Sequence, residues 1–247
     1  MKHVVGFIGT GEIAEIHARS ILDMGFGWRI AGGYDMDQER AGYFCGKYGG
    51  ERYASAEEMV RSPEIDTVYI CTRHDSHAEY GVMACSYGKN VFMEKPVAMD
   101  LESAMRLREF QVRHPVRFAV GYNMRVAPAI LRLNKKLKEY QVVPDTFRVN
   151  MTGTPFMQGW AGHPDIGGGV LVCQGSHMFD LIADVMGSPI NEVCVETQWI
   201  RQSEELEPNC AAALVRLENG VCGTLLMHDQ GNRSYHVEPG GGMVLSL

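Results

Sequence analysis

The chain has no long run of hydrophobic residues. Hydrophobic residues make up 45% of its 247 positions, yet Gly, polar or charged residues interrupt every apolar stretch. No stretch approaches the ~20 consecutive apolar residues that a membrane-spanning helix needs, so we expect no transmembrane segment. The first residues also lack the apolar core and the small-residue cleavage site of a secretory signal peptide. We therefore expect a soluble, cytoplasmic protein.

Basic charge is scarce. Lys and Arg number 23 against 30 Asp and Glu, which leaves a formal net charge of −7 at pH 7. No run of basic residues is longer than Lys135-Lys136. A protein that binds the phosphate backbone of DNA or RNA needs a concentrated basic face. We therefore expect no nucleic-acid partner.

Paired cysteines are absent. The seven cysteines form an odd number and include no CxxC motif, so neither a disulfide framework nor a zinc knuckle is predicted. His74 and His77 are close in the chain, but no third His, Asp or Glu follows at the spacing of a metal-binding motif. We therefore expect no bound metal.

The first half of the chain alternates short apolar strands with helix-length segments. The predicted strands are 4–8, 28–34, 65–71, 90–93 and 117–120, and the predicted helices are 13–22, 37–48, 77–87 and 101–110. Near-continuous apolar strands that alternate with helices are typical of a parallel sheet covered on both faces. The pattern therefore predicts an α/β domain with a doubly wound, Rossmann-type parallel sheet.

The second half contains more strands than helices. The predicted helices are 127–140 and 176–186, and the predicted strands are 146–152, 192–200, 211–217 and 221–227. Their close spacing, with a tight turn at 218–220, favours a C-terminal α+β domain with a mostly antiparallel sheet. We place the boundary near Gly121, which predicts domains at 1–121 and 122–247. Two domains also agree with the chain length at about 150 residues per domain.

A glycine-rich turn follows the first predicted strand and opens the first predicted helix. Its sequence, Gly9-Thr10-Gly11-Glu12-Ile13-Ala14, has the GxGxxG/A pattern of dinucleotide-binding turns. Gly9 allows the tight turn, Gly11 lets the backbone approach a pyrophosphate, and the small Ala14 allows the helix to pack closely on the strand. The helix N-terminus adds amide groups and the positive end of a dipole. We therefore predict that residues 9–13 contact a dinucleotide; the alternative is a plain turn.

Asp35 ends the second predicted strand, 26 positions after Gly9. A carboxylate at this place accepts hydrogen bonds from the ribose hydroxyls of NAD and repels the 2′-phosphate of NADP. The alternative is that Asp35 caps the next helix, for which Asp37 is equally suitable. Arg40 is near enough in sequence to offset part of the repulsion. The predicted cofactor is therefore NAD, with NADP as a second one.

The segment Met93-Glu94-Lys95-Pro96 ends another predicted strand at its carboxyl edge, where doubly wound sheets bind their ligands. A lysine ammonium group there can hydrogen-bond a reacting hydroxyl or carbonyl oxygen and stabilise the negative charge that develops on it. The alternative is a solvated surface lysine. We predict that Glu94 and Lys95 belong to the site.

Taken together, these motifs resemble those of the Gfo/Idh/MocA oxidoreductases. The segments that carry the resemblance are GFIGTGEIAEIHA, VYICTRHDSHAEY, VFMEKPVA and GGGVLVCQGSHMFDLIADVMG, and they cover the chain from residue 1 to about 235. It is their combination and order that is specific. The resemblance implies a Rossmann domain followed by an α/β substrate domain. It also implies the activity of a sugar, inositol or dihydrodiol dehydrogenase.

The resemblance implies roles for residues of the first domain. Lys95 matches the lysine of the EKP motif, which contacts both the nicotinamide ribose and the substrate. Thr72 and His77 fit a TPNxxH-type segment that lines the dinucleotide site. Arg73 and His74 replace the proline and the asparagine of that segment. Thr72, Arg73 and His77 are therefore expected to contact the cofactor.

Four residues of the second half are candidates for substrate contact. Asn123 and Arg125 lie in the segment that leaves the Rossmann domain, and the resemblance implies that they face the substrate. Trp160 and His163 lie in a predicted loop before a glycine cluster, and a sugar ring can stack on an indole. The expected substrate is a small polyol or sugar.

The family motif GGGxLxDxGxHxxD is present with one change. The matching residues are Gly167, Gly168, Gly169, Leu171, Gly175, His177 and Asp180. Cys173 stands where the family has an aspartate and is expected beside the substrate. The resemblance implies that His177 accepts the proton of the hydroxyl being oxidised and that the missing aspartate assists it. Cys173 has no carboxylate to hold an imidazolium, and Asp165 and Asp180 are weaker candidates for that role.

These observations lead to two hypotheses about function. The first is an NAD(P)-dependent oxidoreductase that transfers a hydride between nicotinamide and a secondary alcohol or ketone of a sugar-like or cyclitol substrate. Lys95 would polarise the oxygen and His177 would exchange the proton. The alternative, which Cys173 motivates, is a catalytically weakened or inactive dinucleotide-binding regulatory protein.

The second half is also short for the resembled family, which predicts a shortened sheet and reduced activity. In the family this sheet commonly forms the interface between subunits, so the resemblance implies a homo-oligomer if the sheet is complete. Missing strands would leave an exposed sheet edge.

Overall fold

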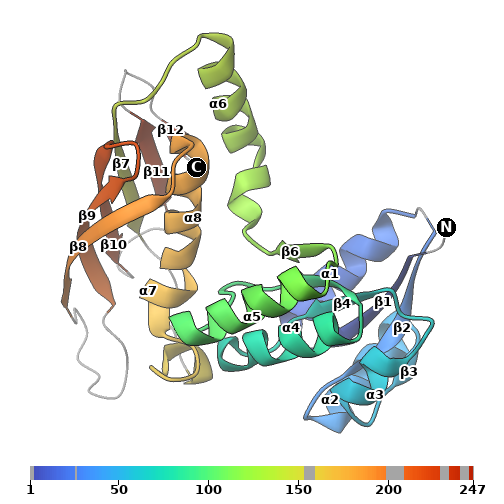
Figure 1. Ribbon diagram of the computed structural model, residues 1–247. Coiled ribbons are helices and arrows are strands. Elements are labelled where there is room, and N and C mark those ends of the chain that lie inside the picture. Colours follow the sequence, from blue (N-terminus) through green and yellow to red (C-terminus); the bar gives the residue numbers. More distant parts are fainter. Residues whose placement is uncertain are drawn as a thin grey trace. The chain divides into compact units, whose positions relative to one another are not determined.

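The protein divides into two compact units, Met1–Gly121 and Tyr122–Leu247, which are described separately (Figure 1). The computed structural model describes residues 3–25, 27–152, 159–198, 209–228, 234–239 and 245–246. Residues 199–200, which the sequence pattern assigns to a strand, lie outside these ranges.

The first unit is built on a six-stranded parallel sheet in the order β3-β2-β1-β4-β5-β6. Its strands are β1 (His3–Ile8), β2 (Trp28–Tyr34), β3 (Glu51–Arg52), β4 (Thr67–Ile70), β5 (Asn90–Met93) and β6 (Phe118–Val120). Its helices are α1 (Glu12–Asp23), α2 (Gln38–Tyr48), α3 (Ala56–Arg61), α4 (His77–Ser86) and α5 (Leu101–Arg113). The doubly wound parallel sheet expected from the sequence is confirmed. The strand order reverses between β1 and β4, the point at which such sheets bind ligands.

Helices bury both faces of this sheet. In β1, Val5 and Phe7 pack into one buried cluster with residues of α1 and α2. Ile8 belongs to a second cluster with residues of α3, α4 and α5. Side chains that alternate along a strand point to opposite faces, so a strand covered on both sides must be apolar at nearly every position. This explains the continuous apolar runs in the sequence.

The second unit contains a six-stranded mixed sheet in the order β12-β11-β7-β10-β9-β8. Its strands are β7 (Thr146–Thr152), β8 (Ile190–Gln198), β9 (Cys210–Leu217), β10 (Cys222–His228), β11 (Ser234–Pro239) and β12 (Leu245–Ser246). Four neighbouring pairs are antiparallel, as expected, but β7 and β10 are parallel. Residues 153–221, with strands β8 and β9 among them, separate β7 from β10 in the chain, so no tight turn imposes an antiparallel direction on this pair.

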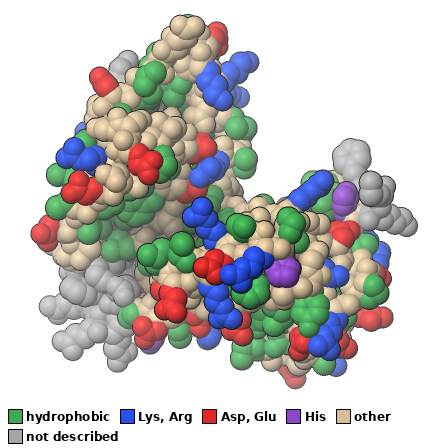
Figure 2. All heavy atoms as spheres, in the orientation of Figure 1, with side chains coloured by type: hydrophobic (Ala, Val, Ile, Leu, Met, Phe, Trp, Pro, Cys, Tyr) green, Lys and Arg blue, Asp and Glu red, His purple; other side chains and the backbone are tan. Residues whose placement is uncertain are grey.

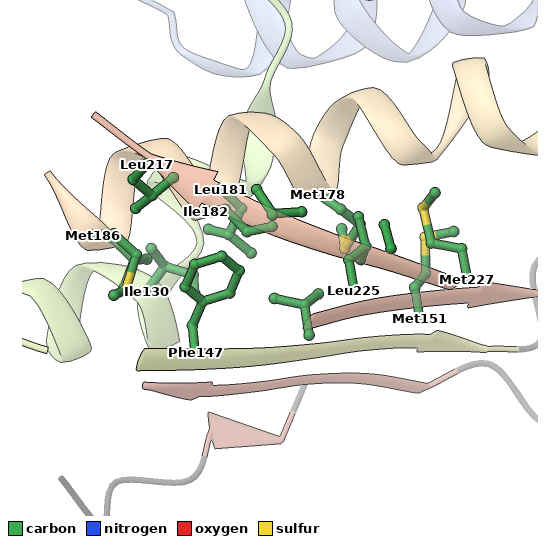
Figure 3. Packing of buried hydrophobic residues seen from close by; sticks show 14 of the residues in the cluster. Ile130, Phe147, Met151, Met178, Leu181, Ile182, Met186, Leu217, Leu225 and Met227 are labelled. Carbon is green, nitrogen blue, oxygen red and sulfur yellow. The ribbon is translucent and has the colours of Figure 1, made fainter. Parts of the chain in front are cut away.

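The core of the second unit lies between one face of its sheet and helix α8 (Gly175–Met186) (Figure 3). The buried residues on β7 alternate at Phe147, Val149 and Met151. On α8 the buried residues follow a helical period and are Met178, Leu181, Ile182, Val185 and Met186. Helix α6 (Pro128–Glu139) adds Ile130, Leu133 and Leu137 to the same cluster. Strand residues that are buried at every second position and helix residues that are buried at a spacing of 3.6 therefore pack into a single core.

Charged side chains of both signs are interspersed over the face of the protein shown in Figure 2. Ion pairs within the first unit include those of Arg29 with Glu64 and of Arg61 with Glu57. Across the described ranges, every helix is too short or too polar to cross a membrane.

Candidate functional site

The glycine-rich turn packs directly on the neighbouring strand. Gly9 has a φ of +83°, and a Cβ there would lie 2.7 Å from the backbone carbonyl of Cys71, just after β4. Only glycine fits this position. A Cβ at Gly11 would instead meet no atom within 4 Å. The backbone at Gly11 therefore borders open space, as it does at the corresponding glycine of dinucleotide-binding turns, where the backbone approaches a pyrophosphate.

Helix α1 begins immediately after this turn. Gly11 is its N-cap residue and supplies no side-chain cap to the first-turn amides. Glu12 and Ile13 are exposed there, whereas Ala14 is fully buried in the cluster beneath the helix. An uncapped helix N-terminus favours an anion through its amide groups and its dipole.

Asp35 connects the end of β2 to the glycine turn. Its Oδ2 accepts hydrogen bonds from the backbone nitrogen of Thr10 at 2.9 Å and from its hydroxyl at 3.1 Å. Its Oδ1 accepts the backbone nitrogen of Asp37 at 2.9 Å. The helix cap of α2 is Asp37, which accepts from Glu39 and Arg40, so the capping alternative for Asp35 is not the one adopted. A carboxylate has about four lone-pair sites, so Asp35 retains roughly one for a ribose hydroxyl.

Arg40 forms an ion pair with the carboxylate of Asp35. One of its guanidinium nitrogens lies 3.7 Å from Oδ2 of Asp35, and another lies 3.3 Å from Oδ2 of Asp37. The Arg40 side chain is about half exposed, at 52%. It therefore offsets part of the negative charge around Asp35, as the sequence suggested.

His77 contacts the backbone of the segment that follows β4. The side chain of His77 is fully buried; its Nδ1 lies 2.7 Å from the carbonyl oxygen of Pro96, and its Nε2 lies 3.1 Å from that of Thr72. One imidazole therefore joins the loop after β4 to the loop after β5. Thr72 is half-buried and accepts a hydrogen bond from Ser76, whereas Arg73 is exposed and paired with Asp75. His74 is buried beside His77, with the ring centroids 5.7 Å apart.

Glu94 and Lys95 follow β5 directly. Oε1 of Glu94 lies 2.7 Å from Nε2 of His17, and Oε2 accepts the backbone nitrogen of Lys95 at 3.3 Å. Burial tends to raise the pKa of the Glu94 carboxyl, but His17 and the charge of Lys95 outweigh it, so this pKa is lowered. Glu94 is therefore ionised at neutral pH. The Lys95 side chain is partly exposed.

These residues meet at one edge of the sheet because parallel strands all end on the same side. Asp35, Gly9, Thr72 and Lys95 follow β2, β1, β4 and β5, which are consecutive neighbours in the sheet. The edge therefore combines a helix N-terminus without a side-chain cap, a buried carboxylate and an ammonium group. This set fits a dinucleotide such as NAD. Across the residues described, no group of three or more His, Cys, Asp or Glu side chains is placed to hold a metal ion.

The second unit contains the other predicted catalytic group. Gly168, in the left-handed region at φ +68°, is the N-cap of the short helix α7 (Gly169–Cys173), and α8 begins two residues after α7 ends. His177, in the first turn of α8, is 6% exposed, and Cys173 is 8% exposed. The ring of His177 meets the ring of Tyr122 edge-on, with centroids 5.8 Å apart. Burial, together with the charge of Asp180, raises the pKa of the Tyr122 phenol.

Arg125 and Asp180 form a close ion pair within the second unit. Nε of Arg125 lies 2.6 Å from Oδ2 of Asp180, and a second guanidinium nitrogen bonds Oδ1. Arg125 also reaches Asp184 at 3.5 Å. Asp180 is therefore committed to Arg125, which weakens the idea that it replaces the aspartate missing at position 173. The Arg125 guanidinium is half exposed at 46%, so its outer face remains open to solvent.

The remaining predicted substrate contacts are accessible. Asn123 and His163 are exposed, and Trp160 is 42% exposed in a 3₁₀ turn at Gly159–Gly162. Asp165 is also exposed, and its backbone nitrogen donates to Nδ1 of His163 at 3.3 Å. These side chains therefore lie at the surface of the second unit.

Two residues of these clusters were not among the predicted site residues. His17 was assigned to packing in the first helix, and Tyr122 was only part of the segment that leaves the first domain. The rings of His17 and Tyr122 do pack. His17 also contacts the predicted site residue Glu94, and Tyr122 contacts the predicted site residue His177. No local spacing in the sequence reveals either contact, because the partners are 77 and 55 positions away.

A His77→Leu substitution tests the connection between the two loops. We expect it to lower the free energy of unfolding by about 2–3 kcal/mol, because it removes a buried imidazole whose one N–H donates to a carbonyl group of this pair, Pro96 or Thr72. Urea unfolding of both proteins at neutral pH measures this difference. His114→Gln, at the end of α5, provides a control histidine, whose ring stacks on Phe110.

The stability contributed by His77 should also depend on pH. Burial lowers the pKa of His77, although the contacts with the carbonyls of Pro96 and Thr72 oppose this shift. The unfolded chain therefore binds this proton more readily, so the contribution is complete above pH ~6.5 and is lost as the pH falls through the lowered pKa. The difference in the free energy of unfolding between wild type and His77→Leu should therefore become smaller at acidic pH. A gap that is constant or widens would contradict this assignment.

Comparison with protein families gives matches to both units. The family described as "Oxidoreductase family, NAD-binding Rossmann fold" matches residues 4–122. The family described as "GFO/IDH/MocA C-terminal domain" matches residues 144–244.

Curated relatives include myo-inositol 2-dehydrogenase of Thermotoga maritima. It is 24% identical over 228 residues, which are 90% of this chain and 67% of the relative. Inositol 2-dehydrogenase 3 of Saccharopolyspora erythraea is 33% identical over 122 residues, which are 49% of this chain and 36% of the relative. The matches thus span about two thirds or less of these relatives.

Solved structures share the fold. GenD2 from gentamicin A biosynthesis, crystallised in complex with NAD, has a TM-score of 0.89 at 19% identity, over 100% of this chain and 72% of that chain. The WlbA dehydrogenase of Bordetella pertussis, in complex with NADH and UDP-GlcNAcA, has a TM-score of 0.87 at 21% identity, over 99% of this chain and 74% of that chain.

Proposed function

Because the chain belongs to the Gfo/Idh/MocA oxidoreductase family, with its NAD-binding Rossmann fold, we propose that it transfers a hydride between NAD and a secondary alcohol or ketone of a sugar-like or cyclitol substrate. The observation that carries the proposal is the carboxyl edge of the parallel sheet. There the open backbone at Gly11, the Asp35 carboxylate and the Lys95 ammonium group follow neighbouring strands.

The two units divide the work in this proposal. Residues 1–121 bind the cofactor through positions 9–13, Asp35, Thr72, Arg73, His77 and the Glu94-Lys95 pair. Residues 122–247 bind the substrate through Asn123, Arg125, Trp160, His163 and Cys173, and supply His177. The names of the curated relatives, inositol dehydrogenases among them, support a polyol or sugar as the substrate class.

Lys95 and His177 perform the proton and charge chemistry. In the oxidative direction, Lys95 donates a hydrogen bond to the substrate oxygen and stabilises the charge that develops as the hydroxyl proton leaves. His177 takes that proton as a general base and returns it in the reductive direction. When bound, the nicotinamide accepts the hydride from the substrate carbon that bears this oxygen, or supplies a hydride to it in the reductive direction.

Thermal-shift titration with NADH, followed by turnover assays on a panel of sugars and cyclitols, tests the proposal. We expect NADH to raise the melting temperature, and at least one polyol to reduce NAD at a rate proportional to enzyme concentration. If millimolar NADH and NADPH both leave the melting temperature unchanged, the cofactor assignment is wrong.

Cofactor preference should depend on Arg40. The Asp35 carboxylate opposes the 2′-phosphate of NADPH, and Arg40 is the cation placed to offset it. We expect NADH to bind more tightly than NADPH, and Arg40→Ala to weaken NADPH binding about fivefold further, which corresponds to about 1 kcal/mol for an exposed ion pair. Calorimetric titration measures both affinities, and the NADH affinity is the internal control. Equal losses for both cofactors would rule out this role for Arg40.

The second candidate function is a regulatory protein that binds a dinucleotide without turning over substrate. It is favoured by Cys173, which stands four residues before His177 and has no carboxylate. Cys173→Asp distinguishes the two functions. A wild type that binds NADH but has no turnover, with turnover gained in the variant, supports the regulatory reading. Ready turnover by wild type excludes it.

The second unit also carries the proposed subunit interface. One face of its sheet packs on α8, whereas Leu214 and Leu226 on the other face are 61% and 39% exposed. We propose a cytoplasmic homo-oligomer that forms through this sheet. Light scattering coupled to size exclusion gives the mass, and a mass equal to one chain would rule out the oligomer.

A further inference from the structure

His17 and Glu94 meet across the first unit, although 77 positions separate them. His17 lies in the second turn of α1, and Glu94 follows β5. Nε2 of His17 is 2.7 Å from Oε1 of Glu94, and the two side chains are only 21% and 14% exposed. An ionised carboxylate accepts hydrogen bonds but cannot donate them, so Nε2 carries the proton of this bond.

Aromatic side chains hold the imidazole of His17 in place. Its ring meets Phe92 of β5 edge-on, with centroids 5.0 Å apart, and Tyr69 of β4 at 5.6 Å. Tyr69 and Phe92 are themselves stacked at 4.7 Å. The ring of His17 therefore packs against side chains of two neighbouring strands of the sheet while its Nε2 lies next to Glu94.

The carboxylate of Glu94 is held on its other sides too. Its Oε2 accepts the backbone N–H of Lys95 at 3.3 Å. A Cβ at Gly121 would lie 3.1 Å from Oε1, so the backbone at the end of β6 closes in on the carboxylate. The backbone nitrogen of Glu94 donates to the carbonyl oxygen of Ile70 at 2.9 Å. Movement of this carboxylate would therefore loosen the hydrogen bond to the backbone of Lys95.

We infer that His17 is a positioning residue for Lys95: it holds the Glu94 carboxylate, whose second oxygen fixes the backbone from which the Lys95 side chain extends. The inference rests on the proposed function, in which Lys95 contacts the substrate oxygen, and it adds a residue of the first helix to that site. Catalysis is sensitive to such placement, because a displacement of about 1 Å can cost roughly 100-fold in rate.

Two substitutions of His17 separate its hydrogen bond from its packing. His17→Phe keeps an aromatic ring against Tyr69 and Phe92 but removes the donor. His17→Gln removes the ring and keeps an N–H donor near the position of Nε2. Glu15→Gln is the matched control, because Glu15 lies on the same helix and binds Lys47 and Tyr48 instead of Glu94.

The first readout is amide hydrogen exchange of Lys95 in the protein without cofactor, followed by NMR. We expect His17→Phe to speed this exchange roughly 2- to 10-fold, since one modest hydrogen bond is loosened. The second readout is kcat with the best substrate of the panel, which we expect to fall about 10- to 100-fold in His17→Phe. In His17→Gln, both the amide exchange rate of Lys95 and kcat should be close to their wild-type values. Glu15→Gln should change neither the exchange rate nor kcat.

Unchanged Lys95 exchange and kcat in His17→Phe would overturn the inference. Equal effects of Glu15→Gln would also overturn it, because His17 would then act only by docking α1. If His17→Phe does not fold, His17→Leu replaces it, because leucine also removes the N–H donor and is smaller than a phenyl ring. If wild type turns over no substrate, the proposed function fails, yet the exchange rates still decide the inference: faster exchange supports it and unchanged exchange overturns it.

Discussion

Lys95→Met is expected to lower kcat/KM by about 100- to 1,000-fold, the range found when one donor to a developing oxyanion is removed. Methionine keeps much of the length and the apolar stem of lysine but cannot donate a hydrogen bond or supply charge. Because the ammonium group matters most when charge develops on the substrate oxygen, the loss should fall mainly on kcat. Initial rates over a range of substrate concentrations measure it.

Lys89→Met is the matched control for Lys95→Met. Lys89 is a buried lysine of the same unit, and its ammonium group donates to the backbone carbonyls of Ser62 and Ile65 at 2.8 and 2.7 Å. Its replacement should lower stability, because two carbonyls lose their donor, while the folded fraction keeps its kcat. A Lys95→Met variant with wild-type kcat would remove Lys95 from the catalytic proposal. Thermal shift with NADH shows whether cofactor binding survives in each variant.

His177→Gln is expected to lower kcat by about 100- to 10,000-fold, the contribution typical of a positioned general acid–base group. Glutamine keeps a polar side chain of similar reach but does not exchange protons near neutral pH. The pH profile of kcat should therefore lose the limb that reports the catalytic base, whereas Lys95→Met should lower kcat over the whole range. Assays across neutral pH separate these two patterns.

Two further variants make the His177 result specific. Tyr122→Phe removes the hydroxyl of Tyr122 and keeps the edge-on ring contact with His177, so it should leave most of the activity. His114→Gln, in the first unit, should leave kcat unchanged. If His177→Gln retains both the rate and the pH profile of wild type, another group exchanges the proton and the assignment of His177 is wrong.

Most of the first unit was predictable from its sequence. The strands 28–34 and 90–93 coincide with β2 and β5, and the glycine turn precedes α1 as expected. These elements were found because a parallel strand buried on both faces must be apolar at nearly every position. The two-residue strand β3 is exposed and too short to show a period, so it was missed. Helix α3 was missed as well, although Ser55 caps it and accepts from the backbone of Glu58.

The second unit was predictable only in part, because the sequence analysis did not include strands β11 and β12 or helix α7, and it did not give the full arrangement of the strands. Alternating burial in β7, β9 and β10 matches the strands expected at 146–152, 211–217 and 221–227. The parallel pairing of β7 with β10 was not expected, because the direction of two strands that are distant in the chain depends on the path between them.

For the candidate site, the sequence identified residue types and the edge of the sheet to which they belong. Gly9, Asp35, Thr72 and Lys95 each follow a predicted strand, and the carboxyl ends of parallel strands share one edge. The absence of long apolar runs, of basic runs and of paired cysteines was likewise visible from the sequence alone. Such features are local, because they depend on neighbours along the chain.

Only the tertiary structure decided which side chains meet. Asp35 bonds Thr10 across 25 positions, Arg125 pairs with Asp180 across 55, and His17 holds Glu94 across 77. These contacts depend on strand order, register and helix placement, which local periodicity does not specify. Asp37 instead of Asp35 caps α2 for the same reason: both residues suit a cap, and the packing of Asp35 on Thr10 leaves the cap to Asp37.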